Sequence, residues 1–188
     1  NDPSKVYDSR FGRTHESEAN LLGVVFTETG VMTAAPYACL APDHWVFTGT
    51  GLGKGDLFGE NSQHERIPGG ASGHETDKMS PSSPANTQLL AKGTNPEDGG
   101  ADMTIYETDS GGAVFSVGSI CWPASILVDE AVSRITANVL RRFASSAMCS
   151  SSESVNTLPE GLCGVLSRIA IVRSVIAASS CAGSYVIV

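Results

Sequence analysis

Hydrophobic residues gather in short runs along the chain, and segments rich in glycine, proline and serine separate the runs. The first run, Leu21 to Thr27, is almost continuously apolar, which is typical of a strand covered on both faces, as in a parallel sheet. Gln88 to Ala91 is a second, shorter strand candidate. Met103 to Glu107 and Ala113 to Val117 flank a turn-rich pentapeptide, and this arrangement predicts a hairpin.

The second strand of this hairpin alternates between two faces. Val114 and Ser116 fall on one face, while Ala113, Phe115 and Val117 fall on the other, so we expect the strand to lie deep in the core. Residues 131–143 show the period of an amphipathic helix, and its apolar face carries Val132, Ile135, Val139, Leu140 and Phe143. The acidic pair before this helix and the arginine pair at its end suit its dipole. Together these elements predict an α/β fold in which a mixed sheet has flanking helices.

The two ends of the chain differ in character from this central part. Residues 1–20 are polar and predict an N-terminal arm. Residues 144–156 are serine-rich and predict a linker. Residues 157–188 are apolar, but Arg168 and Arg173 interrupt them, so a buried helix followed by a final strand is favoured over a membrane-spanning helix. We therefore expect three parts, with the α/β domain over residues 21–143 and a tail over 144–188.

The charge balance and the cysteines exclude several classes of protein. The 188 residues include 12 Lys and Arg and 20 Asp and Glu, giving a net charge of −8. Nucleic acids and anionic membranes require clustered basic residues, so neither is an expected partner. The five cysteines form no C-x-x-C pair in a chain too long to depend on disulfides, which indicates free thiols and a cytoplasmic location.

Glycine is densest between His44 and Asp77, and this stretch is where we expect a site. His44 to Phe47 is a short strand candidate, and glycine then occupies every second position from Gly49 to Gly55. So many glycines indicate unusual backbone conformations or close approach by another group. The run fits neither the phosphate-binding loop nor the dinucleotide fingerprint, because the required glycine and lysine spacings are absent.

Two kinds of chemistry remain open in the second glycine cluster. Gly70 to His74 comes within one residue of the G-x-S-x-G elbow of serine hydrolases, so Ser72 is a candidate nucleophile and an esterase is one alternative. His74, Glu75 and Asp77 offer acid–base chemistry, in which burial would raise the pKa of a carboxyl group toward neutrality. Their spacing does not match a zinc motif, and a loop with solvated charges is the other interpretation.

Four blocks taken together resemble one family. HWVFTGTGLGKGD, GGASGHETD, ADMTIYETDSGGAVFSVGSICW and VSRITANVLRRF occur in this order, over residues 20–143. In order and spacing they resemble the C-terminal part of the N,N-dimethylformamidase large (beta) subunit family. The resemblance implies a layer related to class I glutamine amidotransferases. It also implies a hydrolase of the amide C–N bond that cleaves small N-substituted formamides to formate and an amine.

The resemblance also implies a cofactor and roles for particular residues. Members hold a catalytic iron with two tyrosines and a glutamate, and these ligands match no positions in this sequence, so no metal ligand is assigned. Glu75 takes the position of a glutamate that acts on the substrate, with His74 beside it. Gly70, Ser72 and Asp77 are then the expected substrate-binding residues.

The resemblance covers only a C-terminal piece, so we expect an incomplete sheet with an exposed edge and an exposed apolar face. Such a chain needs self-association, a second subunit or its own tail to cover that surface. A non-catalytic domain that acts only as part of an assembly is therefore the alternative to an enzyme.

Overall fold

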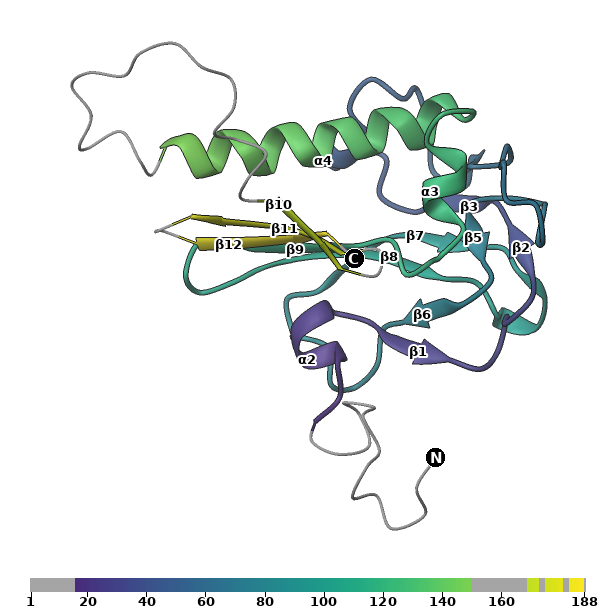
Figure 1. The fold of residues 1–188 in the computed structure, drawn as a ribbon, viewed down its shortest axis with the longest axis horizontal. Helices are drawn as coiled ribbons and strands as arrows, with labels where there is room; N and C mark the ends of the chain where they lie inside the picture. Colours follow the sequence, from purple (N-terminus) through teal and green to yellow (C-terminus); the bar gives the residue numbers. More distant parts are fainter. Residues whose placement is uncertain (1–15, 150–168, 173–174, 181–182, 188) are drawn as a thin grey trace.

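The computed structural model describes residues 16–149, 169–172, 175–180 and 183–187. An eight-stranded sheet lies at its centre, with a long helix on one face and a two-stranded ribbon on the other (Figure 1). The order is β10–β11–β12–β9–β8–β7–β3–β4, and every neighbouring pair is antiparallel except β12 and β9. The strands are β3 (Tyr37–Cys39), β4 (Leu57–Phe58), β7 (Gln88–Gly93), β8 (Asp102–Glu107), β9 (Ala113–Ser116), β10 (Ile169–Val172), β11 (Val175–Ser180) and β12 (Gly183–Ile187). A mixed sheet with helices confirms the predicted α/β class.

The predicted hairpin is confirmed as β8 and β9, and its side chains separate onto the two faces of the sheet. Ile105 pairs with Phe115, and both belong to the main hydrophobic core. Val114 lies on the opposite face with Tyr106, and the Ser116 hydroxyl donates to the Leu22 carbonyl there at 2.6 Å. The alternation follows from the pleat of the strand.

The predicted helix is confirmed as α4 (Glu130–Cys149), which covers the sheet above β7, β8 and β9 (Figure 1). Four residues of its apolar face are buried: Val132, Ile135, Val139 and Phe143. The Asp129 carboxylate caps its start by accepting from the Val132 N–H at 3.1 Å. The helix also includes residues 144–149, which the sequence assigned to a linker. The serine run at this point continues the helix because a preformed helix propagates readily.

The opposite face of the sheet carries a ribbon of β1 (Val25–Thr27) and β6 (Thr76–Lys78), beside α2 (Ala19–Leu22). The prediction of one doubly covered, parallel strand over residues 21–27 was wrong. Gly23 adopts a left-handed conformation (φ 77°) that ends α2, and β1 then pairs antiparallel with β6. Phe26 in β1 is 45% exposed, so the ribbon has only one covered face.

Two short strands complete this side of the sheet, and the predictions for residues 44–47 and 88–91 can be compared with the structure. The two-residue strands β2 (Ala34–Ala35) and β5 (Ser72–Gly73) form a second small antiparallel pair. Residues 44–47 do not form the predicted strand but the 3-10 helix η1 (Trp45–Phe47), since the His44 side chain accepts from the Val46 N–H as a cap. Gln88 to Ala91 is confirmed as a strand, and it extends to Gly93 as β7.

The remaining helical turns and the tail complete the described chain. The turns are η2 (Pro96–Asp98) and α3 (Trp122–Ser125). In the tail, the expected helix is wrong for residues 169–172 and 175–180, which form β10 and β11, whereas the final strand is confirmed as β12. The helix start expected near Thr157 lies outside the described residues. Among the described helices, none combines the length and apolar character that crossing a membrane requires.

Candidate active site

Residues 70–78 contain every residue that the sequence nominated, and they run along the ribbon side of the sheet. β5 pairs with β2, and β6 pairs with β1. His74 and Glu75 form the connection between β5 and β6, and a further bridge pairs Gly73 with Glu75 across it. Two residues that are neighbours in sequence are thus presented on one tight turn.

The glycines of this segment are explained by close approach of the protein's own backbone. A Cβ atom on Gly70 would lie 2.3 Å from the carbonyl carbon of Ala35, and one on Gly73 would lie 2.0 Å from the Thr33 oxygen. Real Cβ atoms are never found at such distances, so only glycine fits beside β2 at these two positions. The close approach inferred from the sequence is therefore present, and Gly70 packs against backbone.

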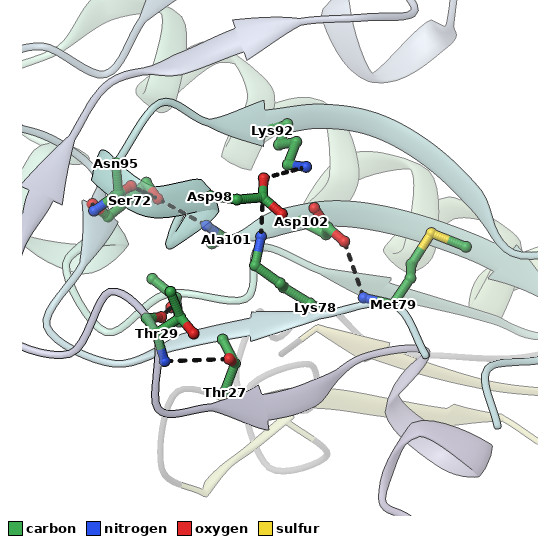
Figure 2. Close-up of polar contacts among 11 residues, drawn as sticks. Thr27, Thr29, Ser72, Lys78, Met79, Lys92, Asn95, Asp98, Ala101 and Asp102 are labelled. Carbon is green, nitrogen blue, oxygen red and sulfur yellow. Dashed lines mark hydrogen bonds and ion pairs between the residues drawn. The ribbon is translucent and has the colours of Figure 1, made fainter. Parts of the chain in front are cut away.

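Ser72 is the centre of a buried hydrogen-bond network (Figure 2). Its hydroxyl donates to Asn95 Oδ1 at 2.7 Å and accepts from the Ala101 N–H at 3.0 Å. The Asn95 amide in turn donates to Thr33 Oγ1 and to the Ser72 carbonyl, at 2.8 and 3.0 Å. Ser72 is fully buried, and Asn95 is 5% exposed. This network ties β5 to the segment before β2 and to the connection between β7 and β8, and Asn95 is a residue that sequence reasoning missed.

The same contacts bear on the serine-esterase alternative. A nucleophilic serine needs its proton to point to a general base. The Ser72 proton points instead to an amide oxygen, which does not accept a proton at ordinary pH. The geometry therefore favours a structural role for this hydroxyl.

His74 adopts a left-handed backbone conformation, with φ at 71°. Its ring lies 5.1 Å from the His64 ring, with an angle of 40° between the planes. The His74 Nδ1 atom is buried and has no hydrogen-bond partner. His64 Nδ1 accepts from the Ile67 N–H at 3.1 Å, so a neutral His64 carries its proton on Nε2. The two histidines therefore form a pair whose second member was not foreseen.

Glu75 and Asp77 alternate along the turn and β6, and they differ in environment. Glu75 is exposed, whereas Asp77 is half-buried opposite Phe26 of β1. Burial raises the pKa of the Asp77 carboxyl to about 6, with smaller contributions from the nearby carboxylates of Glu75 and Glu18. A carboxyl group with a pKa near 6 can both accept and release a proton close to neutral pH.

A second polar cluster lies near the Ser72 hydrogen-bond network and draws its residues from β6, β7, β8 and the turn η2 (Figure 2). Asp98 forms an ion pair with Lys92, in which Nζ lies 2.6 Å from Oδ1, and the Lys78 Nζ lies 3.8 Å from the same oxygen. Asp102 accepts from the Met79 N–H at 3.0 Å, and burial raises the pKa of its carboxyl. These residues are far apart in sequence, so no local pattern predicted the cluster.

The tyrosines with described side chains do not fit the iron ligand set that the resemblance implies. The Tyr37 hydroxyl donates to the Val117 carbonyl at 2.7 Å, and the Tyr106 hydroxyl donates to the Leu21 carbonyl at 2.5 Å. Burial raises the pKa of both phenols, which disfavours the phenolate that would bind a metal. Within the described residues, no group of three or more His, Cys, Asp or Glu side chains is placed to bind a metal.

Three cavities lined by described residues border α4 or η1. One of about 200 Å³ lies between η1, the β8–β9 hairpin and the C-terminal half of α4. Another lies between the loop from Gly49 to Leu52 and the first turn of α4, and the third lies beside Trp45 and Asn138. Residues 70–77 line none of the three. Of the candidate residues, Glu75 is exposed, His74 and Asp77 are half-buried, and Gly70 and Ser72 are buried.

Fold and site together define an α/β domain that presents an imidazole and two carboxyl groups on a glycine-flanked turn. The chain belongs to the family described as N,N-dimethylformamidase beta subunit-like, C-terminal, whose model matches residues 2–133. This match confirms the resemblance drawn from the four sequence blocks.

Two relatives carry the name N,N-dimethylformamidase beta subunit. The chain is 34% identical over 131 residues to the protein from Paracoccus aminophilus, and 31% identical over 131 residues to the one from Alcaligenes sp. Each alignment covers 53% of this chain and 16% of the relative. The chain thus spans about a sixth of the length of these relatives.

Proposed function

We propose that this chain is part of a hydrolase that cleaves the C–N bond of small N-substituted formamides. The family match supports the proposal, because the two relatives are named for dimethylformamide. The observation that carries it in this chain is the nearness of exposed Glu75 to Asp77, whose carboxyl has a pKa raised to about 6 by burial and by the charge of Glu75. This pair offers a proton acceptor within reach of solvent and a second group that titrates near neutral pH.

Hydrolysis of a formamide needs proton transfer at two points. Water attacks the formyl carbon and loses a proton, and the amine nitrogen gains a proton as the C–N bond breaks. In the proposed reaction Glu75 accepts the proton from water and returns it to the departing amine, so formate and amine are the only products. His74 and Asp77 flank Glu75 on the same turn, and the nearby Glu75 carboxylate contributes to the raised pKa of Asp77.

Other parts of the resemblance also stay proposals. Gly70 and Ser72 contribute by fixing the backbone around the turn, because both are buried against neighbouring loops. No iron ligand is assigned here, because the Tyr37 and Tyr106 hydroxyls donate to backbone carbonyls. The relation to glutamine amidotransferases, the division of the chain at residues 20 and 143, and a cytoplasmic location remain predictions. The free thiols of Cys39 and Cys121 support that location.

The test is formate release from N,N-dimethylformamide by the purified 188-residue chain. We expect Glu75→Gln to lower the rate by about 100-fold or more, because general base catalysis contributes that much. The matched control is Glu65→Gln, which removes an exposed carboxylate from a nearby loop and leaves the rate unchanged. Wild-type rates in the Glu75→Gln variant would contradict the proposal.

A second candidate function is a non-catalytic part of an assembly, formed from copies of this chain or with another subunit. Exposed apolar side chains on the ribbon side favour it, since Leu21 is 62% and Met32 is 51% exposed. The relatives are themselves named as subunits. Stable oligomers in sedimentation experiments, together with no formate release by the wild-type chain, would favour this function over the enzyme.

A further inference from the structure

The turn that follows β9, at residues 117–121, forms hydrogen bonds with the chain on both sides of the His74–Glu75 connection. On one side, the Gly73 N–H donates to the Ser119 hydroxyl at 2.8 Å, and the Cys121 N–H donates to the Gly73 carbonyl at 3.3 Å. On the other side, the Asp77 N–H donates to the Gly118 carbonyl at 2.8 Å. A bridge also pairs Thr76 with Ser119. The residues that bear the candidate acid–base groups therefore lie between two fixed points.

Ser119 makes more of these hydrogen bonds than any other residue of the turn. Its hydroxyl oxygen accepts from the Gly73 N–H and from the Cys121 N–H, the latter at 3.1 Å. It donates to the Ala71 carbonyl oxygen, which lies 2.8 Å from the hydroxyl oxygen and is closer than the Gly73 carbonyl oxygen at 3.1 Å. One proton and two lone pairs are all that a hydroxyl group has, so its bonding capacity is complete. Ser119 is 7% exposed, so water cannot readily replace these bonds.

The backbone conformation at His74 makes this support necessary. A residue other than glycine is strained at a φ of 71°, and such strain persists only where surrounding contacts hold it. Ser119 supplies such contacts to the residues immediately before the turn, Ala71 and Gly73. Loss of the hydroxyl would therefore remove contacts that hold the backbone next to the strained residue.

We propose that Ser119 is a positioning residue for the His74–Glu75 turn, and through it for the Glu75 carboxylate. This inference rests on the proposed amide hydrolysis for its catalytic consequence, but not for its structural part. Ser119 acts through backbone groups and does not touch substrate. The sequence block GSICW that contains it offered no sign of this role.

The test compares Ser119→Ala with Ser125→Ala. Both serines are buried, but the Ser125 hydroxyl has no hydrogen-bond partner, so its removal controls for the loss of a buried hydroxyl group. Amide hydrogen exchange of the full chain is measured residue by residue. We expect exchange at Gly73, whose N–H loses the Ser119 oxygen, to be about tenfold faster in Ser119→Ala. Exchange at Cys121 should rise less, because its N–H keeps the Gly73 carbonyl, and both rates should be unchanged in Ser125→Ala. Equal exchange in the two variants would overturn the proposal.

Kinetics of formate release supply a second measurement. A misplaced base lowers the rate of the chemical step rather than substrate binding, so we expect kcat to fall about 10- to 100-fold while KM changes less than about twofold. A rise in KM with unchanged kcat would contradict positioning of Glu75. If the wild-type chain releases no formate, the proposed function fails, and the exchange measurement still decides the structural role.

Isosteric variants cover the case in which Ser119→Ala does not fold. Threonine and valine have nearly the same shape, and only threonine retains the hydroxyl group. We expect Ser119→Thr to restore slow exchange at Gly73 and Cys121, and Ser119→Val not to. Identical behaviour of the two variants would show that the hydroxyl is not what holds the turn.

Discussion

The two faces of the central sheet are held by different forces. Under α4 the sheet presents an apolar surface, in which Ile105 and Phe115 pack with the buried face of the helix. Under the ribbon the same strands present the polar residues Asp102, Thr104 and Ser116 beside a small apolar cluster of Tyr106 and Val114, and the side chains of Asp102 and Ser116 form hydrogen bonds to backbone groups. An apolar core does not accommodate the polar groups that acid–base catalysis needs, so the candidate site lies on the polar face.

Neighbouring residues of β8 give the largest expected contrast between the two faces. Ile105→Ala empties a site in the α4 core, and we expect it to lower the free energy of unfolding by about 2–5 kcal/mol. Thr104→Ala removes an equally buried side chain from the ribbon face, where its hydroxyl has no partner, and should cost much less. Denaturant unfolding measures both. Equal losses would show that the faces are not held differently.

Asn95 tests whether the ribbon face depends on its hydrogen bonds. Asn95→Ala removes the acceptor of the buried Ser72 proton and the amide that donates to Thr33 Oγ1 and to the Ser72 carbonyl, and we expect a loss of about 2–3 kcal/mol, since buried groups that lose their partners are costly. Asn86→Ala serves as the control, because that exposed amide donates only to the Glu107 carbonyl. If thermal unfolding shows the same small change for both, the buried network contributes little.

Asp77 provides the smallest effect and the one with a pH signature. The pKa of its carboxyl is about 6 in the folded chain and 3.8 in a model peptide, so the folded state binds the proton more tightly. The stability from this group is complete below pH 3.8, and it is lost as the pH rises through about 6. We expect Asp77→Asn to stabilise the chain at pH 7.5 by about 1–2 kcal/mol relative to its effect at pH 4.

Thermal unfolding between pH 4 and 8 measures this difference. The matched control is Asp109→Asn, which alters an exposed carboxylate in the β8–β9 turn. An Asp77→Asn variant that follows the pH dependence of the wild type would place the shifted group elsewhere.

The elements predicted well from the sequence are those with strong local periodicity. α4 and the β8–β9 hairpin repeat their apolar positions over many residues, so local order matches the final packing. Residues 44–47 and 21–27 were misassigned because a short apolar run suits a helical turn as well as a strand. There a capping side chain and one left-handed glycine decided the conformation.

The candidate site divides in the same way. His74, Glu75 and Asp77 are neighbours in sequence, so their proximity was evident. Their environment was not, because the pKa of Asp77 depends on burial and on Glu18, which lies far away in sequence. The Ser72–Asn95 contact joins residues 23 positions apart, and Ser119 reaches Gly73 over 46. Such contacts leave no local pattern.

At position 74, the left-handed backbone conformation makes the residue best for stability differ from the residue that supplies an imidazole. Glycine adopts this conformation without strain, so His74→Gly would relax the backbone while removing the imidazole. A library screened only for heat resistance would therefore drift toward glycine there. A library screened for turnover would retain histidine. The residue recovered at this position therefore shows whether stability or turnover was selected.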